Sequence, residues 1–480
     1  MRGCFSTYAS FAEHDRDVLS PNGRAGFIVP TGIATDDTTK GFFADLVVHG
    51  NLAAFYGFEN EAKLFKGIDH RVNFCLLILS SHAVLAPSFS AFLREPSLLR
   101  DPTRVYQLTA ADIALLNPNT KTCPVFRARR DADLNRAIYR RIGVFWRDGN
   151  LDSGNPWGLR FVAMLHMAND SALFRALANR DSKVAYLPLY EAKMVYHFNH
   201  RFGDFALLSS GDREHILPQT PDDKLDQAEY LTHPRYWVPD DEVTSRLRGA
   251  WSREWLLGWR DITDARSSVR TVVASIIPRA AVGHTLPVML PAFEPAQVAA
   301  LYANLCSFVL DYAARQKVGG THLTYNFLKQ LPVLSPNTYE VSPAWSPGSL
   351  LRDWFLPRVL ELTYTAWDLA PFAHDVGYDG PPFRWVPERR FLLRCELDAA
   401  FFHLYGLPRD DVDYVMDTFP IVRKNDEKAH GEYRTKRVIL EIYDAMAEAM
   451  RTGKPYQTRL DPPPADPRVA HPPRKKELAG

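Results

Sequence analysis

Positively charged side chains are concentrated between residues 121 and 146 of this 480-residue chain. Arginine can hold a phosphate through two parallel hydrogen bonds and stays charged at any relevant pH, so a row of arginines suits a nucleic-acid backbone. Leu134, Ile138 and Ile142 follow a helical spacing, which predicts a helix with the arginines on its solvent face. The segment therefore predicts phosphate contacts, with a solvated helix face as the alternative. Its basic residues are Lys121, Arg127, Arg129, Arg130, Arg136, Arg140 and Arg141.

A second polar segment combines two cations, backbone donors and a pair of glycines. Glycine has no side chain to keep a ligand at a distance, and successive backbone N–H groups attract anions. The composition therefore suits a turn that closely approaches a phosphate backbone. The residues are Arg315, Gln316, Lys317, Val318, Gly319, Gly320 and Thr321.

One short motif has the residue types of a metal-dependent nuclease. Asp181 is followed by Glu191-x-Lys193, and such carboxylates hold Mg²⁺ while the lysine stabilises the developing charge. The same two-residue spacing also occurs at Glu61 and Lys63, which shows how easily it arises by chance. A nuclease therefore remains an alternative function.

Two further motifs are assigned no chemistry. His197-x-x-His200 has no cysteine or third histidine nearby, so we predict no metal site. The sequence Asn-Pro-Asn-Thr at 117–120 shares its first two residues with the Asn-Pro-Pro-Tyr loop of amino-methylating enzymes, but its last two residues differ. We interpret it as a turn.

The composition limits the classes of protein to which these motifs can belong. At roughly 150 residues per domain the chain has room for about three domains. The 57 Lys and Arg nearly balance 56 Asp and Glu, so any surface that binds a polyanion must be local. The five cysteines lack Cys-x-x-Cys spacing, which argues against a disulfide framework or a zinc site. Without a membrane-spanning stretch or signal peptide, a cytoplasmic protein is expected.

The first 85 residues predict alternating helices and strands. A helix is expected before the Pro-Asn-Gly turn at 21–23, then a short buried strand at 26–29 that Pro30 ends,. A helix follows to about His49, and two strands are expected at 52–58 and 72–79. The last strand is apolar almost throughout, as in sheets covered on both faces.

The remainder of the chain divides by texture into three parts. Residues 86–340 are irregular, rich in proline and aromatic clusters, and predict a mixed α+β region. Residues 341–450 are predicted to be mainly helical. Residues 451–480 are rich in proline and charge, which predicts a disordered tail,.

Taken in order, several segments resemble adenine-specific DNA methyltransferases of the type IIG restriction-modification kind. Gly-Arg-Ala-Gly-Phe-Ile-Val-Pro-Thr at 23–31 is similar to a late strand of their catalytic domain, and 52–58 with 63–67 and 71–77 to its terminal β-hairpin. The similarity continues through their target-recognition region at 117–127, 188–194 and 316–323. The resemblance implies an α/β fold with a partial methyltransferase-type sheet at 1–85, a target-recognition region at 86–340 and a helical segment at 341–450.

The resemblance also implies what the chain lacks. The family's catalytic domain binds S-adenosylmethionine with a glycine loop and aligns the adenine with an Asn-Pro-Pro-Tyr loop. Neither motif occurs here, since the chain contains no Gly-x-Gly. We therefore expect no catalytic residue and no cofactor binding in this chain alone, and an N-terminal methyltransferase half or subunit as partner. Whether this chain is itself an enzyme is left open.

The resemblance assigns roles to named residues. A methyltransferase that modifies adenine N6 must take the base out of the duplex, and a flipped base needs an aromatic surface. Phe65, between the two hairpin strands, occupies the family's aromatic position for such stacking; ordinary loop packing is the alternative. The residues expected to contact double-stranded DNA are Arg127, Arg129, Arg130, Lys193, Arg315, Lys317, Gly319, Gly320 and Thr321.

The leading hypothesis is thus a DNA-recognition and partial catalytic module of a site-specific adenine methyltransferase. A stand-alone DNA-binding protein is the second hypothesis, and the metal-dependent nuclease is the third. An upstream reading frame that encodes the two missing motifs would favour the first over the second. The recognised DNA sequence cannot be deduced, because base readout depends on the few side chains that reach the groove.

Overall fold

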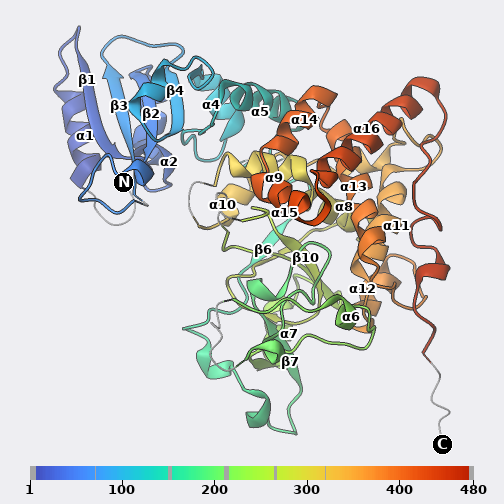
Figure 1. The fold of residues 1–480 in the computed structure, drawn as a ribbon. Coiled ribbons are helices and arrows are strands. Elements are labelled where there is room, and N and C mark those ends of the chain that lie inside the picture. Colours follow the sequence, from blue (N-terminus) through green and yellow to red (C-terminus); the bar gives the residue numbers. More distant parts are fainter. Residues whose placement is uncertain are drawn as a thin grey trace, which may run out of the picture. The chain divides into compact units, whose positions relative to one another are not determined.

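A computed structural model describes residues 7–70, 72–149, 154–209, 216–263, 268–318 and 321–474. The chain forms two compact units (Figure 1). Unit 1 comprises Met1–Gly154 with the returning segment Lys329–Pro332, and unit 2 comprises Asn155–Leu328 with Val333–Gly480. The fold is mixed α/β, with several small sheets and a helical C-terminal region. Among the described residues, no helix is both long and apolar enough to cross a membrane.

Unit 1 is built on a five-stranded sheet in the order β1-β3-β2-β4-β5. Strands β1 and β2 both pair antiparallel with β3, while β2 pairs parallel with β4. The predicted strands and the antiparallel hairpin of β2 and β3 are confirmed. The elements are α1 (Thr7–Asp17), β1 (Arg24–Pro30), α2 (Gly32–Thr35), α3 (Lys40–Val48), β2 (Leu52–Glu59), β3 (Asn73–Ser80), β4 (Ser88–Leu93), β5 (Tyr106–Gln107), α4 (Ala110–Leu116) and α5 (Arg129–Ile142).

The prediction that residues 26–29 form a buried strand is wrong in one respect. Strand β1 forms, but it is the edge of the sheet, and none of its seven residues is buried. Ile28 is 58% exposed. An apolar run indicates a strand that is partly buried, but it does not show how many strands flank it. Strand β1 has only one neighbour, β3.

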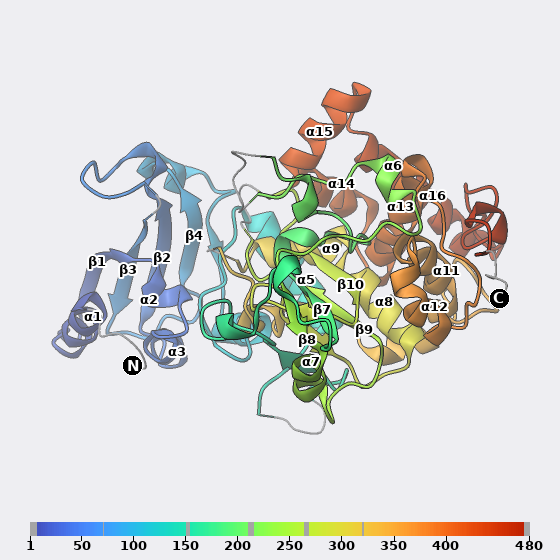
Figure 2. The same cartoon turned by 90° about the horizontal axis from the view of Figure 1, so that it is seen from below.

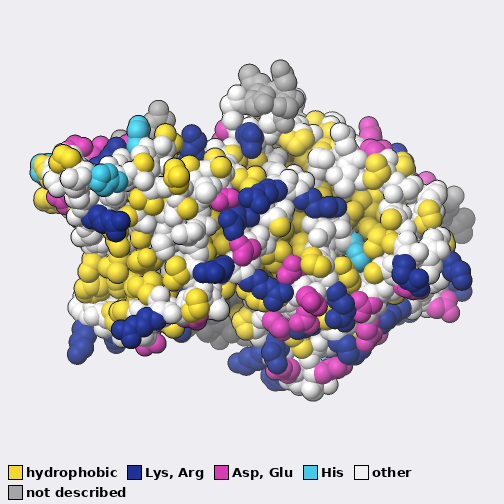
Figure 3. Space-filling model, turned by 90° about the horizontal axis from the view of Figure 1, so that it is seen from above, with side chains coloured by type: hydrophobic (Ala, Val, Ile, Leu, Met, Phe, Trp, Pro, Cys, Tyr) yellow, Lys and Arg dark blue, Asp and Glu magenta, His cyan; other side chains and the backbone are white. Residues whose placement is uncertain are grey.

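The helices α1, α2 and α3 lie on one side of this sheet (Figure 2). Phe43 and Leu46 of α3 are buried, as are Phe55 and Leu77 of the sheet. On the other face of the sheet, directly paired residues point to the same side, and Ile28, Leu76 and Tyr56 form one such row,. All three are at least partly exposed. Figure 3, with unit 1 at its left, shows hydrophobic side chains gathered there.

Helix α5 has the predicted two-sided character. Leu134 and Ile138 are buried, whereas Arg129, Arg130 and Arg140 are exposed. The predicted turn at 117–120 is confirmed, and it follows α4.

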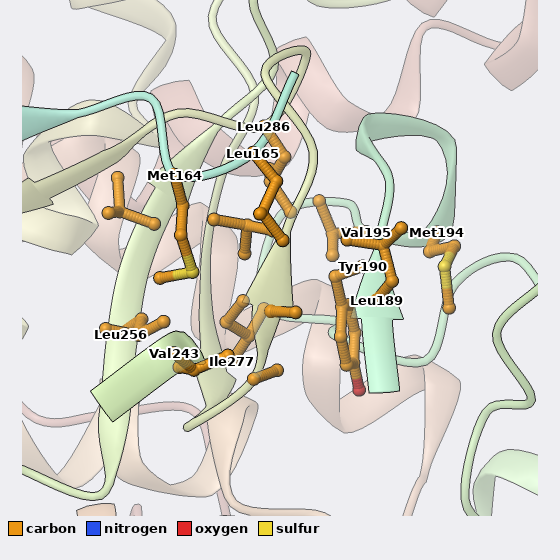
Figure 4. Packing of buried hydrophobic residues seen from close by; sticks show 14 of the residues in the cluster. Met164, Leu165, Leu189, Tyr190, Met194, Val195, Val243, Leu256, Ile277 and Leu286 are labelled. Carbon is orange, nitrogen blue, oxygen red and sulfur yellow. The ribbon is translucent and has the colours of Figure 1, made fainter. Parts of the chain in front are cut away.

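Unit 2 contains a four-stranded sheet in the order β10-β9-β12-β6 and a three-stranded sheet in the order β11-β7-β8. Between them lies a core that includes Met164, Tyr190, Val243, Leu256 and Ile277 (Figure 4). The elements are β6 (Arg160–Val162), β7 (Tyr186–Tyr190), α6 (Asp222–Leu225), β8 (Trp237–Pro239), α7 (Asp240–Leu247), β9 (Trp255–Trp259), β10 (Ala274–Pro278), β11 (Ala281–Val282) and β12 (Val288–Leu290).

The rest of unit 2 is helical, as predicted for residues after 341. Helix α13 packs against α11 and α16, and α11 packs against α8. The helices are α8 (Pro295–Leu305), α9 (Phe308–Arg315), α10 (Tyr325–Leu328), α11 (Leu351–Thr363), α12 (Ala370–Asp375), α13 (Pro387–Leu404), α14 (Arg409–Asp417), α15 (Pro420–His430) and α16 (Arg434–Thr452).

The predicted disordered tail is wrong for residues 451–474, which pack on the helices. Arg389 donates hydrogen bonds to the carbonyl oxygens of Pro462 (2.6 Å) and Pro463 (2.9 Å). The Ala465 N–H donates to Glu361 at 2.8 Å. Arg389 and Glu361 are both buried and pair with each other. The tail provides the further hydrogen-bond partners that these buried side chains need. Residues 475–480 lie outside the described residues.

The two units do not coincide with the predicted boundaries. The polypeptide from 86 to 154 packs with the first 85 residues rather than with the region to which its sequence assigned it. The predicted boundaries at 85, 340 and 450 divide the chain by its resemblance to a family of longer proteins. They remain a prediction.

Arg201 in unit 2 is a fully buried charged side chain, with no measurable exposure. Its guanidinium donates five hydrogen bonds, all to protein oxygens. The acceptors are the carbonyl oxygens of Leu225, Gln227, Tyr230 and Thr365 and the Thr365 hydroxyl. Arg201 therefore ties the irregular segment around residues 225–230 to the end of α11.

We predict that Arg201→Met lowers the unfolding free energy of unit 2 by about 3–5 kcal/mol, because removing one side of a buried charged network leaves polar groups without partners. Urea denaturation followed by tryptophan fluorescence measures this, since nine of the ten tryptophans lie in unit 2. Arg451→Met, on the exposed face of α16, is the control and should leave the midpoint unchanged. An equally small shift for both variants would contradict the structural role of Arg201.

Candidate nucleic-acid interface

The loop between β2 and β3 is held by one buried amide. The Asn60 side chain accepts a hydrogen bond from the Phe65 N–H (3.0 Å) and donates to the carbonyl oxygens of Phe65 (3.1 Å) and Ile68 (3.2 Å). Asn60 itself is fully buried. These three bonds fix the backbone on both sides of Phe65, although the loop lies outside regular structure. Sequence reasoning missed Asn60, and its place directly after the last strand residue was the available signal.

The Phe65 ring is 36% exposed and meets Phe74 edge-to-face at a centroid distance of 4.8 Å. Phe74 in turn stacks on Phe58 at 5.2 Å. An edge-to-face contact occupies at most one face of the Phe65 ring. The structure therefore places Phe65 in the predicted loop, on an aromatic base, and is compatible with both packing and stacking. Its role in stacking stays a prediction.

The predicted DNA contacts of unit 1 cluster where α5 begins. The Arg127 guanidinium lies 4.0 Å from the ring centroid of Phe92, and its residue is exposed. Arg129 donates from Nε to the Val105 carbonyl oxygen at 3.0 Å. Arg130, the next residue, is also exposed. The three guanidinium groups thus lie at the solvent surface of one rigid element.

Two arginines further along α5 are engaged by an acid of α4. Asp112 accepts from Arg136 (3.4 Å) and Arg140 (3.2 Å), and it also forms a capping box with Thr109. Burial by itself raises the pKa of Asp112, but the hydrogen bonds from Thr109 and the charge of Arg136 outweigh it, so the pKa is lowered,. Asp112 therefore remains charged and offsets part of the positive face of α5.

In unit 2, the predicted contact Lys193 is paired with an acid. Its Nζ lies 3.2 Å from Glu191 Oε2 and 4.8 Å from the ring centroid of Phe205. Glu191 and Lys193 are thus side by side, but the nuclease alternative also requires a second carboxylate, Asp181, beside Glu191 to hold a metal ion,. No group of three His, Cys, Asp or Glu among the described residues is arranged to hold a metal ion.

The two histidines of the His-x-x-His motif face different partners. His197 contacts the Val272 carbonyl oxygen at 2.7 Å, and His200 contacts Asp368 at 3.0 Å. Both rings are buried.

The turn after α9 is described only in part. The Arg315 guanidinium, largely buried, donates to the carbonyl oxygens of Ser268 (3.0 Å) and Val269 (2.9 Å), and it lies 4.3 Å from the Phe419 ring centroid. In this conformation it is therefore directed at protein groups. Thr321 is exposed, and its carbonyl oxygen accepts from the Thr263 N–H. Gly319 and Gly320 lie outside the described residues, so their expected role remains untested.

Lys317 is partly buried, and this burial lowers the pKa of its ammonium group from 10.5 to about 7,. An amine with such a pKa is only partly charged at neutral pH. The strength of any phosphate contact by Lys317 therefore depends on pH, and this could not be foreseen from residue type alone.

Sequence reasoning also missed two arginines that stack on aromatic rings near β8. The Arg180 guanidinium lies 4.3 Å from the Trp237 ring centroid, and that of Arg235 lies 5.1 Å from Tyr236. Arg175 is hydrogen bonded to Trp237 through the backbone, which brings the two segments together. Arginine planes next to partly exposed aromatic rings are suited to bases and phosphates alike,. The arginine directly followed by two aromatic residues at 235–237 was the available signal.

No protein-family model matches the chain, and no curated protein matches its sequence. Among solved structures, it is similar to the type IIL restriction-modification enzyme MmeI, determined in complex with DNA, with 11% identity and a TM-score of 0.37. That match covers 92% of this chain and 52% of MmeI. It is also similar to the type IIG restriction endonuclease BpuSI, with 13% identity, a TM-score of 0.29, and coverage of 94% and 50%. The chain spans about half the length of each.

We predict that the chain binds duplex DNA with strong salt dependence and that Arg129→Gln weakens this dependence. Each lost phosphate contact reduces the slope of log affinity against log salt by about 0.9. Fluorescence anisotropy with a labelled duplex at several salt concentrations measures the slope. Arg451→Gln is the charge-matched control and should keep the wild-type slope. An unchanged slope in Arg129→Gln would mean that this charge faces solvent in the complex.

A second prediction follows from the lowered pKa of Lys317. If its ammonium group contacts a phosphate, DNA affinity should fall several-fold as pH rises from 6 to 8.5, because the charged form is lost above a pKa of about 7,. In Lys317→Arg the charge persists, so the affinity should depend less on pH. The histidines are the same in both proteins, so the difference between the two pH profiles isolates Lys317. Identical profiles would remove Lys317 from the interface.

Proposed function

We propose that this chain is the DNA-recognition and partial catalytic module of a site-specific adenine-N6 DNA methyltransferase from a restriction-modification or phage-defence system. It works with a separate or upstream half that binds S-adenosylmethionine and carries the Asn-Pro-Pro-Tyr loop. The ordered series of sequence segments that resemble this family is the starting point. The observation that carries the proposal is the apolar edge and face of the unit 1 sheet that the described residues of this unit leave exposed.

The edge strand β1 is suited to pairing with a strand of another polypeptide. It is seven residues long, and its alternate residues Arg24, Gly26, Ile28 and Pro30 are exposed. Natural edge strands are usually short, charged or covered, because a free edge pairs with other chains. Here only Arg24 carries a charge. A partner strand beside β1 would extend the sheet and bury Ile28.

The sheet face next to this edge supports the same conclusion. Phe74, Leu76 and Ile78 of β3 are only partly buried, and they lie on the same face of the sheet as Ile28, which pairs with Leu76. Figure 3 shows hydrophobic side chains gathered on this unit. A large exposed apolar patch marks an interaction site. The upstream half is the partner that fits.

In this proposal the chain contributes recognition rather than the methyl-transfer groups. The exposed arginines at the start of α5 hold the DNA backbone, and Phe65 provides a surface for the flipped adenine. The cofactor supplies the methyl group, and it binds the other half. The isolated chain is therefore expected to give no heat of binding with S-adenosylmethionine in calorimetry.

The experiment reconstitutes the enzyme with the polypeptide encoded directly upstream, supplied separately or in a restored frame, and measures transfer of labelled methyl groups to DNA. Stacking a base on an aromatic ring is worth about 1–3 kcal/mol. We expect Phe65→Ala to slow methylation of a normal duplex by roughly 5- to 150-fold, while Phe65→Trp keeps a stacking face and is milder. A mismatch opposite the target adenine lowers the cost of flipping, so the Ala variant should lose less on that substrate.

Two controls separate the possible causes of failure. Leu64→Ala changes the neighbouring exposed side chain and should leave both rates unchanged. Ile28→Asp should prevent association of the two polypeptides without weakening DNA binding by this chain. Equal losses by Phe65→Ala on paired and mismatched DNA would assign Phe65 to hairpin packing. If no upstream frame encodes the missing motifs and the chain still binds DNA, the stand-alone DNA-binding protein replaces the proposal.

A further inference from the structure

Unit 2 contains a cavity of about 200 Å³ between α8, α9, α13 and the segment at 196–198. An apolar cavity of about 150 Å³ holds a molecule the size of benzene, whereas pockets for drug-sized ligands measure roughly 300–1,000 Å³. The cavity therefore has room for one heteroaromatic ring system but not for an attached sugar. Much of its wall is aromatic, with Tyr196, Phe198, Phe308 and Phe391 among the lining residues.

Three polar groups in the cavity wall have unused hydrogen-bonding capacity. Asp398 is 6% exposed, and its Oδ1 accepts from the Phe308 N–H at 2.7 Å. His197 is 5% exposed and donates from Nε2 to the Val272 carbonyl oxygen, which leaves Nδ1 as an acceptor. Arg394 is exposed. In the described part of the chain, no hydrogen bond to Asp398 Oδ2 or His197 Nδ1 is formed, and Arg394 forms no ion pair, although its charge and that of Arg270 act on Asp398.

Other charged groups at the cavity are already satisfied. Arg270 donates to Asp311 at 2.9 Å and to the Cys306 carbonyl oxygen at 2.7 Å. Burial raises the pKa of the Cys306 and Cys395 thiols, so both remain protonated and unreactive,. Burial also raises the pKa of Asp398 to about 6, so at pH 7.5 its carboxylate is mostly ionised and able to accept hydrogen bonds.

The arrangement specifies the chemistry of a ligand. Two acceptors, Asp398 Oδ2 and His197 Nδ1, line an aromatic cavity, so the buried part of the ligand must be a flat ring that donates from N–H groups. An exocyclic amine on a heteroaromatic ring meets this requirement. The exposed guanidinium of Arg394 calls for a negative group outside the cavity, and Arg binds phosphate well.

We propose that this cavity binds a nucleobase with an exocyclic amine, attached to a phosphate that Arg394 holds. The base comes from a free nucleotide or from a nucleic-acid strand. This site lies in unit 2 and is independent of Phe65 and of the arginines on α5, so it does not rest on the proposed function. It also needs no glycine loop, because the phosphate is held by a side chain at the surface.

The test is calorimetry of the full chain with adenosine 5′-monophosphate and inosine 5′-monophosphate. In inosine a carbonyl oxygen replaces the exocyclic amine and N1 carries a proton, so the donor at the amine position is lost and only a ring N–H remains. We expect the adenine nucleotide to bind at least tenfold more tightly, because a buried acceptor that loses its donor is left unpaired. Adenosine, which lacks phosphate, should bind more weakly than its monophosphate. Arg394→Gln should remove that difference and leave adenosine binding unchanged.

Asp398→Asn is the variant for the buried end of the ligand. Its amide oxygen can still accept from the Phe308 N–H, so α9 keeps its start, while the amide nitrogen replaces the free oxygen with a donor. The preference for the amine should then disappear or reverse. Unchanged melting temperatures confirm that both variants fold. Val422→Ala removes an apolar part of the cavity wall and should weaken the binding of both nucleotides equally.

A further arm distinguishes the two sources of the base. The affinity of the chain for single-stranded oligodeoxyadenylate is compared with its affinity for adenosine monophosphate at equal molar concentration of the two ligands. Tighter binding of the oligonucleotide, lost in Asp398→Asn, identifies a strand as the source; tighter binding of the mononucleotide identifies a free nucleotide. No binding of either at millimolar concentration, equal affinity for the amine and carbonyl forms, or wild-type affinity in Asp398→Asn would each overturn the proposal.

Discussion

Unit 2 depends on buried guanidinium groups that satisfy backbone carbonyl oxygens. Arg201 donates to oxygens at 225, 227, 230 and 365, and Arg390 donates to the carbonyl oxygens of Leu362 and Phe198. Irregular backbone has no ladder in which to pair its polar groups, and a buried carbonyl without a donor is costly. The two arginines supply those donors. They thereby join the irregular segment after β7 to the helices α11 and α13 across more than 100 residues of sequence.

The same constraint explains why the C-terminal segment is ordered. Arg389 and Glu361 form a buried ion pair between α13 and α11, and such a pair repays its desolvation only if its remaining donors and acceptors are satisfied. The segment at 462–465 does this with two carbonyl oxygens and one N–H. Unit 1 is organised differently, because its sheet leaves an apolar edge and face unsatisfied. In unit 2 the C-terminal segment satisfies buried polar groups, whereas the described residues of unit 1 leave apolar side chains exposed.

Sequence predicted those features that depend on neighbouring residues. Apolar runs and turn residues located β1, β2 and β3, and helical spacing separated Leu134 and Ile138 from the arginines of α5. Features that depend on residues far apart in the sequence could not be predicted. Composition could not show that β1 is an edge, that prolines near 462 would meet Arg389, or that Asn60 would hold the Phe65 loop. Among the candidate site residues, sequence showed charge at Arg315 and Lys317 but not their burial.

The role proposed for Phe65 requires that its loop be held in place. A side chain that is to receive a flipped base must be in position beforehand, since ordering it during binding would consume part of the stacking energy. Asn60 fixes the backbone at Phe65 with bonds to both its N–H and its carbonyl oxygen, and Phe74 supports the ring. Packing of Phe65 on Phe74 is therefore compatible with stacking of a base on Phe65, because the edge-to-face contact occupies at most one face of the Phe65 ring. The aromatic base of the loop is what allows the exposed ring to be rigid.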